Sequence, residues 1–214
     1  MFWLAWLSSC VATGLRLGAG YQASQSAVPN AQPIVLYEFE ACPFCKIARE
    51  QVSASGLKVE MRPCPKNGER YRPELIERGG KAQFPYMIDP NTGTEMYESG
   101  DIAAYVRKTY GGRRPVLHWL GPFNPILANF SILIRGLAGQ RRSKAGNGSA
   151  NEKEFLLKGQ EWQPGTRLIR EILCSRQIHY IWDTSHSGPP HLVAPDMAEP
   201  VIGAQNIANY LKTL

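Results

Sequence analysis

The sequence predicts an α/β protein made of two consecutive halves, the second a truncated copy of the first. Two observations lead to this prediction. Between residues 34 and 110, short runs of β-branched and aromatic residues alternate with helical patterns. Three stretches of this half then recur, in the same order, in the rest of the chain. At 214 residues and 43% hydrophobic, the chain can bury two small cores or one sizeable core.

The repeat defines how the chain is organised. The first match pairs Leu15-Arg16 and Gly20 with Ile134-Arg135 and Gly139. The second pairs Arg49-Glu50 with Arg170-Glu171. The third pairs residues 85–90 with residues 190–195 and extends to Ile102 and Tyr105, opposite Ile207 and Tyr210. The second match sets Cys42-Pro43-Phe44-Cys45 opposite Gln163-Pro164-Gly165-Thr166, so the later half keeps the proline and lacks both thiols. It is also shorter, by about one helix, between the second and third matches.

These matches divide the chain into four parts. They are an N-terminal helix and linker (1–32), a first domain (33–112), an inter-domain helix with a basic Gly/Ser linker (113–152) and a degenerate second domain (153–214). The apolar segment 1–11 lacks the basic start of a signal peptide and has about half the length of a membrane-spanning helix. Because its counterpart at 125–139 lies inside the chain, we expect a structural helix before each domain.

The first domain should contain four strands and three helices. We place strands at 34–39, 58–62, 86–89 and 94–98, and helices from the Cys-Pro-Phe-Cys motif to residues 56–57, at 73–78 and at 99–110. Pro90-Asn91-Thr92-Gly93 joins the last two strands as a hairpin, and Ser99 can cap the last helix. A helix between the first two strands makes them parallel, whereas the hairpin makes the last two antiparallel. This is the layout of the thioredoxin fold.

The two cysteines of the motif predict thiol chemistry at the start of the first helix. Unpaired N–H groups and the helix dipole favour a thiolate at Cys42, so we expect Cys42 to be the nucleophile. Cys45, one turn further on, would resolve a mixed disulfide at Cys42. Pro43 fixes the backbone at the helix start, and Phe44 offers an apolar edge to a ligand. Inert burial of both cysteines is an alternative; a zinc site would need a second cysteine pair at matching spacing.

The segment 36–110 resembles the glutaredoxin and glutathione S-transferase N-terminal domain family, in a tandem arrangement with a degenerate second copy. The residues that carry the resemblance are Cys42-Pro43-Phe44-Cys45, Phe84-Pro85 and Glu98-Ser99. The resemblance implies glutathione as ligand and reductant. Phe84, before a cis Pro85, would pair with its cysteinyl part, and Glu98-Ser99 would hold its γ-glutamyl group. Lys81 and Asp101 would contact the charged ends of the peptide.

Together these features predict a cytoplasmic, glutathione-linked thiol-disulfide oxidoreductase acting on protein or small-molecule disulfides, without a metal. Five cysteines, an odd number, favour a reducing compartment over a secreted disulfide framework. The net charge of +6 comes without a nucleic-acid reader motif, so no nucleic-acid partner is expected. A non-catalytic binding module is the main alternative. Glutathione conjugation is a third and weaker alternative, because it would need an all-helical transferase domain for the second substrate, and none follows Tyr110. Binding of an iron–sulfur cluster together with glutathione, a plastid location and peripheral membrane contact are further alternatives.

Aromatic residues between the two halves have two interpretations. Trp119 and Phe123, beside Pro122 and Pro125, are expected to pack the inter-domain segment. The alternative is a membrane-interface role shared with Trp3 and Trp6. We expect His179, His186 and His191 to have no metal-binding role.

Overall fold

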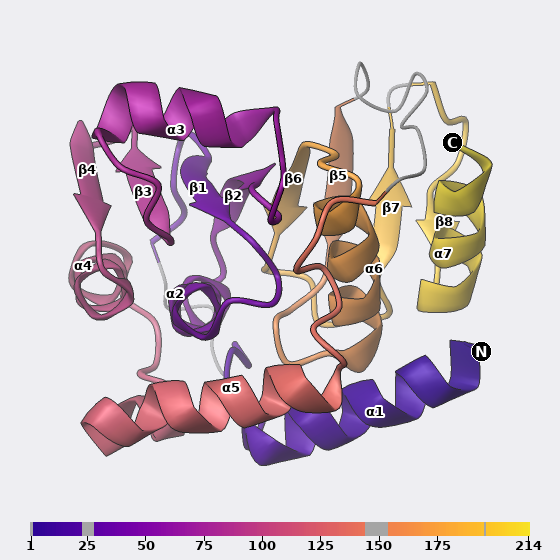
Figure 1. Ribbon diagram of the computed structural model, residues 1–214, viewed down its shortest axis with the longest axis horizontal. Helices are drawn as coiled ribbons and strands as arrows, with labels where there is room; N and C mark the ends of the chain where they lie inside the picture. Colours follow the sequence, from indigo (N-terminus) through magenta and orange to yellow (C-terminus); the bar gives the residue numbers. More distant parts are fainter. Residues whose placement is uncertain (1, 23–27, 144–153, 195) are drawn as a thin grey trace.

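The first half of the chain folds as its local patterns predict. A computed structural model describes residues 2–22, 28–143, 154–194 and 196–214 (Figure 1). After helix α1 (Phe2–Leu15), the first half contains β1 (Ile34–Glu38), α2 (Pro43–Ala54), β2 (Lys58–Pro63), α3 (Tyr71–Gly79), β3 (Tyr86–Asp89), β4 (Thr94–Tyr97) and α4 (Ser99–Tyr110). The predicted strands and helices of this half are thus confirmed, to within a few residues at their ends.

Two local features differ from or refine the predictions. Glu98, with a φ of 67°, occupies the N-cap position of α4, and Ser99 is the first helical residue. The prediction that Ser99 caps this helix is therefore wrong by one residue, because the backbone turns into the helix at Glu98, through its positive φ. Gly80, with a φ of 77°, ends α3 in the left-handed conformation that glycine adopts without steric cost.

The second half contains a shorter set of elements in a related order. A kinked 3₁₀ segment η1 (Val116–Phe123) and helix α5 (Asn124–Ile134) lead to β5 (Phe155–Lys158), α6 (Pro164–Ser175), β6 (Tyr180–Asp183), β7 (His191–Val193), β8 (Val201–Ile202) and α7 (Ala204–Thr213). In the described residues no helix lies between β6 and β7, where the first half has α3 between β2 and β3. The basic linker predicted up to residue 152 lies outside the described residues from Lys144 onward.

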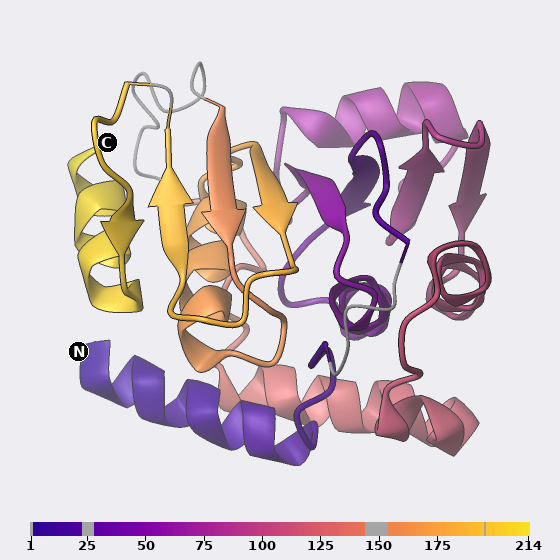
Figure 2. The ribbon, with the colours of Figure 1, turned by 180° about the vertical axis from the view of Figure 1, so that it is seen from behind.

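All eight strands form one sheet, in the order β4-β3-β1-β2-β6-β5-β7-β8 (Figure 2). The centre of the sheet is the antiparallel pair β2–β6, in which Val59 faces Trp182. On either side of it, the strand order and directions repeat: β1 is parallel to β2 as β5 is to β6, and β3 and β7 run antiparallel to β1 and β5. The two halves therefore share one continuous sheet, in which the β2–β6 pair joins them.

Each face of the sheet has its own core because strand side chains alternate between faces. Ile34 and Leu36 of β1 face α2 and α4, in a large cluster that continues into the second half through Phe155 and Trp182. Val35 and Tyr37 point to the opposite face, where α3 covers a smaller cluster. Since the second half has no described counterpart of α3, this face of the sheet is covered by a helix in the first half only.

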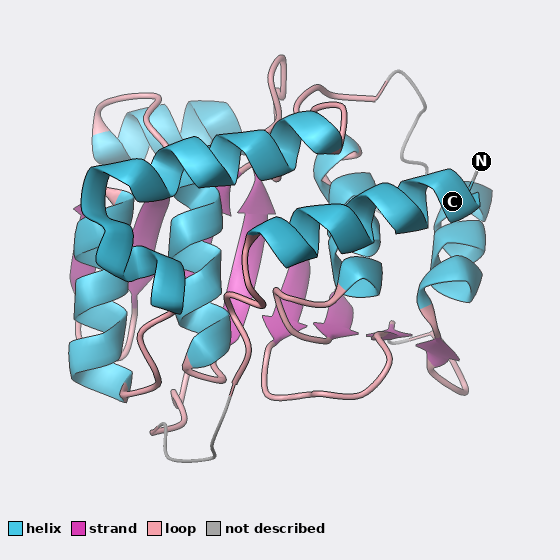
Figure 3. Ribbon diagram, turned by 90° about the horizontal axis from the view of Figure 1, so that it is seen from below, coloured by secondary structure: helices cyan, strands magenta, loops and turns pink. Residues whose placement is uncertain are grey.

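Helices α1 and α5 form an outer layer beyond α2 and α6 (Figure 3). They pack against each other, and each crosses to the other half: α1 lies on α6, and α5 lies on α2. Arg135, after α5, donates to both carboxylate oxygens of Glu171 at 2.8 and 2.5 Å, and Arg16, after α1, binds Glu50 in the same way at 2.7 and 2.6 Å. The residues of the first two sequence matches thus make equivalent ion pairs in the two halves.

Trp119 and Phe123 do not pack the segment between the halves. Trp119 is 71% exposed and Phe123 is 65% exposed, so that prediction is wrong. The buried residues of α5 are instead Asn124, Ala128, Ser131 and Ile132. Among the described helices, none is long and apolar enough to cross a membrane.

Candidate thiol site

The two thiols of the motif lie at the start of α2, in different environments. Cys42 is the N-cap residue, with extended backbone angles of −109° and 120°, and Pro43 is the first helical residue. This geometry aims the Cys42 Sγ at the first turn, where it accepts a hydrogen bond from the backbone N–H of Cys45 at 3.2 Å. The Cys45 side chain is fully buried, whereas Phe44 between them points outward and is 48% exposed.

The pKa values of the two thiols shift in opposite directions. Hydrogen bonds from the Cys45 thiol and backbone lower the pKa of Cys42 against the opposing effect of its own burial, and the Arg49 charge assists. Burial raises the pKa of Cys45 well above its ordinary range, and the adjacent Cys42 raises it further. These shifts favour a thiolate at Cys42 and a protonated thiol at Cys45, which is the arrangement needed for attack followed by resolution.

The positive charge near the thiols comes from a buried ion-pair cluster. Arg49 is fully buried and pairs with Glu38 and, at 3.4 Å, with both Glu40 and Glu161. Burial raises the pKa of Glu38 to about 7, because the carboxylate is desolvated. Lys46 points away from the thiols and binds Glu161 at 3.2 Å. The Arg49 charge therefore contributes to the lowered pKa of Cys42.

The loop with Phe84-Pro85 lies beside the loop that leads to Cys42. The peptide bond between Phe84 and Pro85 is cis, as the family resemblance implies. The Phe84 ring packs edge-on against Phe39 at 5.6 Å, and the Phe39 carbonyl accepts the backbone N–H of Cys42 at 3.1 Å. The packing of these two aromatic rings brings the proline loop to the motif.

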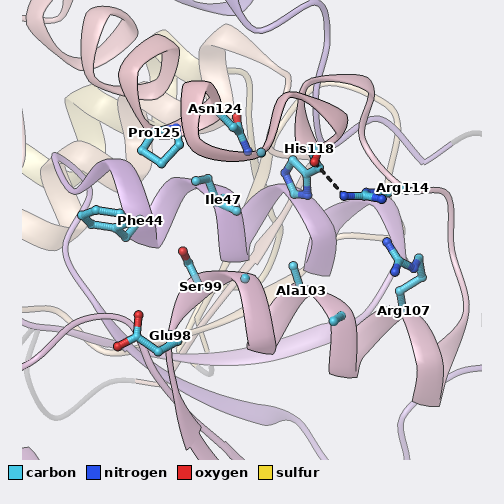
Figure 4. A pocket seen from close by; sticks show the side chains of 13 residues that line it. Phe44, Ile47, Glu98, Ser99, Ala103, Arg107, Arg114, His118, Asn124 and Pro125 are labelled. Atoms are coloured by element: carbon cyan, nitrogen blue, oxygen red, sulfur yellow. Dashed lines mark hydrogen bonds between the residues drawn. The ribbon is translucent and has the colours of Figure 1, made fainter.

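A cavity of about 360 Å³ opens next to the thiol site (Figure 4). Phe44 and Ile47 of α2 line one wall, and Ser99 at the start of α4 lines the opposite one, beside Glu98. Three of the predicted ligand-binding residues, Phe44, Glu98 and Ser99, are thus brought to one cavity. Gln83 donates to the Glu98 carboxylate and so orients it.

Other predicted ligand contacts lie outside this cavity. Lys81 is exposed, and its ammonium group sits 4.5 Å from the centre of the Tyr97 ring. Asp101 is exposed one turn into α4 and is not part of the cavity lining. Phe84 and Pro85 form the neighbouring loop, on the side of the smaller core cluster.

Sequence reasoning missed three polar side chains that line the cavity, those of Arg107, Arg114 and His118. Arg107 lies two turns after Ser99 on α4, and its guanidinium makes no hydrogen bond or ion pair with any described residue. Arg114 donates to the His118 carbonyl at 2.8 Å (Figure 4), and the His118 ring contacts Glu50 at 3.1 Å. Because Arg107 lies two turns after Ser99 on the same helix, this spacing could have indicated that Arg107 belongs to the site. Arg114 and His118 come from the segment between the halves, for which no local pattern predicts a position.

The second half has hydrogen bonds related to those of the first, without the two thiols of the motif. Where Cys42 accepts from Cys45, Gln163 accepts from the Thr166 hydroxyl at 2.9 Å. Cys174 lies where the first half has Ser53. Cys174 accepts from the Glu40 N–H and donates to the Gly139 carbonyl at 3.3 and 3.2 Å, and Ser53 bridges Glu161 and Gly20 in the same way at 2.9 and 2.6 Å.

The remaining thiols and histidines do not form a second reactive centre in the described part of the chain. Burial raises the pKa of Cys64 and of Cys174, which disfavours their thiolates. No group of three His, Cys, Asp or Glu side chains among the described residues could hold a metal ion.

Comparison with known proteins shows that the thiol-bearing half is similar to the glutathione S-transferase N-terminal domain. The sequence model of that family matches residues 36–114, which confirms the resemblance for this part of the chain. A solved structure with some similarity is glutathione transferase BmGSTD1 of Bombyx mori, at 24% identity and a TM-score of 0.36. The match covers 44% of this chain and 48% of that one, about half its length, and is too distant to bear on mechanism. No curated protein matches the chain.

Proposed function

We propose that this protein is a glutathione-linked thiol-disulfide oxidoreductase that uses Cys42 as nucleophile and Cys45 as resolving thiol. The observation that carries the proposal is the hydrogen-bonded pair at the start of α2, in which the pKa of Cys42 is lowered and that of Cys45 is raised. A thiolate and a protonated thiol one helical turn apart match the two steps of thiol-disulfide exchange.

The reaction would proceed by two exchanges. The Cys42 thiolate attacks the glutathione sulfur of a mixed disulfide, forms a Cys42–glutathione disulfide and releases the substrate thiolate. Cys45 then attacks the Cys42 sulfur, its proton passes to the departing glutathione thiolate, and a Cys42–Cys45 disulfide remains. Two molecules of glutathione reduce this disulfide and leave as oxidised glutathione, so electrons and protons balance.

Glutathione is the ligand that the family implies and that the cavity chemistry suits. The peptide carries two carboxylates at neutral pH. The cavity offers the N-terminus of α4 at Ser99 and the guanidinium of Arg107, and both attract carboxylates. We propose that Pro43, Phe44, Phe84, Pro85, Glu98 and Ser99 line the bound peptide, with Lys81 and Asp101 as outer contacts.

We further propose that the second half is a diverged, catalytically silent copy of the first, without α3. Its mirrored strand order, its ion pair Arg135–Glu171 and its Gln163–Thr166 hydrogen bond support this interpretation. The enzyme would act in a reducing compartment such as the cytoplasm, where a dithiol stays reduced between cycles.

A non-catalytic glutathione- or protein-binding module is the second candidate. It is favoured by one observation: Cys42 is only 4% exposed, so a large disulfide needs a rearrangement to reach its sulfur. Conjugation of glutathione to an electrophile is a third function, which the family match makes testable with chlorodinitrobenzene.

The deciding experiment is reduction of a small glutathione mixed disulfide, coupled to glutathione reductase, with wild type, Cys42→Ser and Cys45→Ser. We expect turnover by wild type, none by Cys42→Ser, and partial turnover by Cys45→Ser, because glutathione can replace the resolving thiol. Absence of turnover in wild type, together with measurable glutathione binding by calorimetry, would favour the binding module instead.

A further inference from the structure

The outer layer of the protein is apolar on the side that faces solvent. On α1 the exposed side chains Trp3, Leu7 and Val11 recur every four residues, and on α5 Ile126, Phe130 and Leu133 follow the same helical spacing. Each set therefore forms a stripe along one helix face. Because α1 and α5 pack side by side as the outermost elements (Figure 3), the two stripes share one side of the molecule.

These two helices are reversed relative to ordinary surface helices. In a soluble protein the large apolar residues of a helix face the core and the polar ones face water. Here the buried residues of α1 are small, Ser9 and Ala12, and α5 buries Ala128 and Ser131 beside Ile132. Phe2 and Trp6 pack partly against the core. Most of the large apolar side chains of the two helices nevertheless point outward, so the pattern favours an apolar environment outside the protein.

The charges around this layer have one sign. Neither residues 2–37 nor residues 102–151 contain an aspartate or glutamate. Arg113 lines a hollow together with Leu17 and Val116, at the end of α1. The Arg114 guanidinium lies 4.3 Å from the centre of the exposed Trp119 ring on η1. The apolar layer therefore has arginines beside it where α1 ends and η1 begins, and it carries no acidic side chain of its own.

We propose that α1, α5 and the adjoining η1 dock in the plane of a lipid bilayer that contains anionic headgroups. A face of two apolar stripes with Arg113 and Arg114 beside it, and with no acidic side chain, fits an acyl-chain boundary below a negatively charged headgroup layer. At 14 and 11 residues, both helices are too short to span the hydrocarbon core, so they would lie in the interface. Trp119 and Phe123, exposed on η1, would sit at headgroup depth.

This orientation places the thiol site near the membrane surface. Gly121 of η1 and Asn124 and Pro125 of α5 form one wall of the cavity beside Phe44 (Figure 4). Since the same segment carries the docking face, the cavity would lie just above the headgroups. The proposal concerns where the protein is held and does not depend on the redox chemistry of Cys42.

Co-sedimentation of the full chain with lipid vesicles tests the proposal. We expect binding to vesicles of phosphatidylcholine with about three-tenths phosphatidylglycerol, and weaker binding to phosphatidylcholine alone. The double variant Leu7→Glu/Phe130→Glu should lower vesicle affinity about tenfold or more, and Arg113→Ala should lower affinity for the anionic vesicles only. The matched control is Ile76→Glu: Ile76 is 47% exposed on α3, across the sheet, and its replacement should change nothing.

Three results would overturn the proposal. One is absence of wild-type binding to either vesicle type. Another is equal binding by wild type and the double variant, with circular dichroism showing both folded. The third is a concentration-dependent dimer in light scattering that Leu7→Glu/Phe130→Glu dissociates, without vesicle binding, because a second copy of the chain would then cover the face. The rate of Cys42 alkylation in each variant reports independently on the thiol site.

Discussion

The backbone N–H of Cys45 lies 3.2 Å from the sulfur of Cys42, and this contact separates the roles of two otherwise similar thiols. It forms because Cys42 is extended at the N-cap while Pro43 already has helical geometry. The contact satisfies one of the free N–H groups at the start of α2 with a sulfur acceptor. A negative charge on that sulfur is stabilised, and Cys45, buried behind it, stays protonated.

Alkylation of Cys42 should therefore persist to lower pH than alkylation of an ordinary thiol. A lowered pKa keeps the thiolate populated as pH falls, so the rate should reach half its maximum below the usual thiol value of about 8.5. Iodoacetamide labelling followed by peptide mass spectrometry measures this rate, with free glutathione as the reference thiol. A midpoint at or above that of glutathione would contradict the assignment, as would faster labelling of Cys45.

Removal of the Arg107 guanidinium should weaken glutathione binding if the cavity beside Phe44 is the ligand site. We expect Arg107→Gln to raise the dissociation constant about fivefold to tenfold, the effect of losing one charge-assisted contact. Isothermal titration calorimetry provides the measurement. Lys108→Gln is the matched control, because Lys108 is the next residue on α4, is exposed and lies outside the cavity lining. Equal losses in both variants would point to a general charge effect.

The ion pair between Arg135 and Glu171 should contribute far more to the free energy of unfolding than an exposed ion pair does. Arg135→Met leaves the Glu171 carboxylate buried without its partner, and we expect a loss of about 3 kcal/mol in the free energy of unfolding. Arg78→Met removes the exposed pair with Glu95 and should cost at most about 1 kcal/mol. Urea unfolding of both variants gives the comparison, and similar losses would contradict the structural role of the Arg135 pair.

Gly20 should be more sensitive to substitution than Gly18, although both have a positive φ. A Cβ atom at Gly20 would lie 2.6 Å from the Glu161 Cβ, whereas nothing lies within 4 Å of one at Gly18. We expect Gly18→Ala to cost about 1 kcal/mol for its left-handed backbone, and Gly20→Ala about 1–3 kcal/mol more for the overlap. Thermal unfolding tests this difference. If the two variants have the same melting temperature, the close approach of Gly20 to Glu161 is absent in solution.

Cys174 should accept serine better than valine. Its sulfur accepts the Glu40 N–H and donates to the Gly139 carbonyl, and Ser53 already performs both tasks in the first half. Cys174→Ser is therefore expected to cost less than about 1 kcal/mol, and Cys174→Val about 1–3 kcal/mol, because the valine leaves both backbone groups unpaired. Denaturant titration distinguishes these outcomes, and the reverse order would show that Cys174 acts as a purely apolar side chain.

The prediction from sequence succeeded where local interactions decide structure. Pro43 after Cys42, the Pro90 to Gly93 turn and the alternation of Val59 and Met61 each act through neighbouring residues, and the elements they predict are present. The prediction that Ser99 caps α4 was wrong by one residue. The turn is made by Glu98 with a positive φ, and this conformation has no distinct sequence signal.

The amino-acid sequence alone thus determined the strands and helices of the first half and the thiol pair at a helix start. Only the tertiary structure decided that β2 pairs with β6 to make one sheet, that α1 and α5 cross to opposite halves, and that Arg107, Arg114 and His118 meet at the cavity beside Phe44. It also decided that Trp119 is exposed rather than packed. Local patterns specify hydrogen bonds and burial within a few residues, whereas the pairing of strand edges and of helix faces depends on shapes that form only after those elements exist.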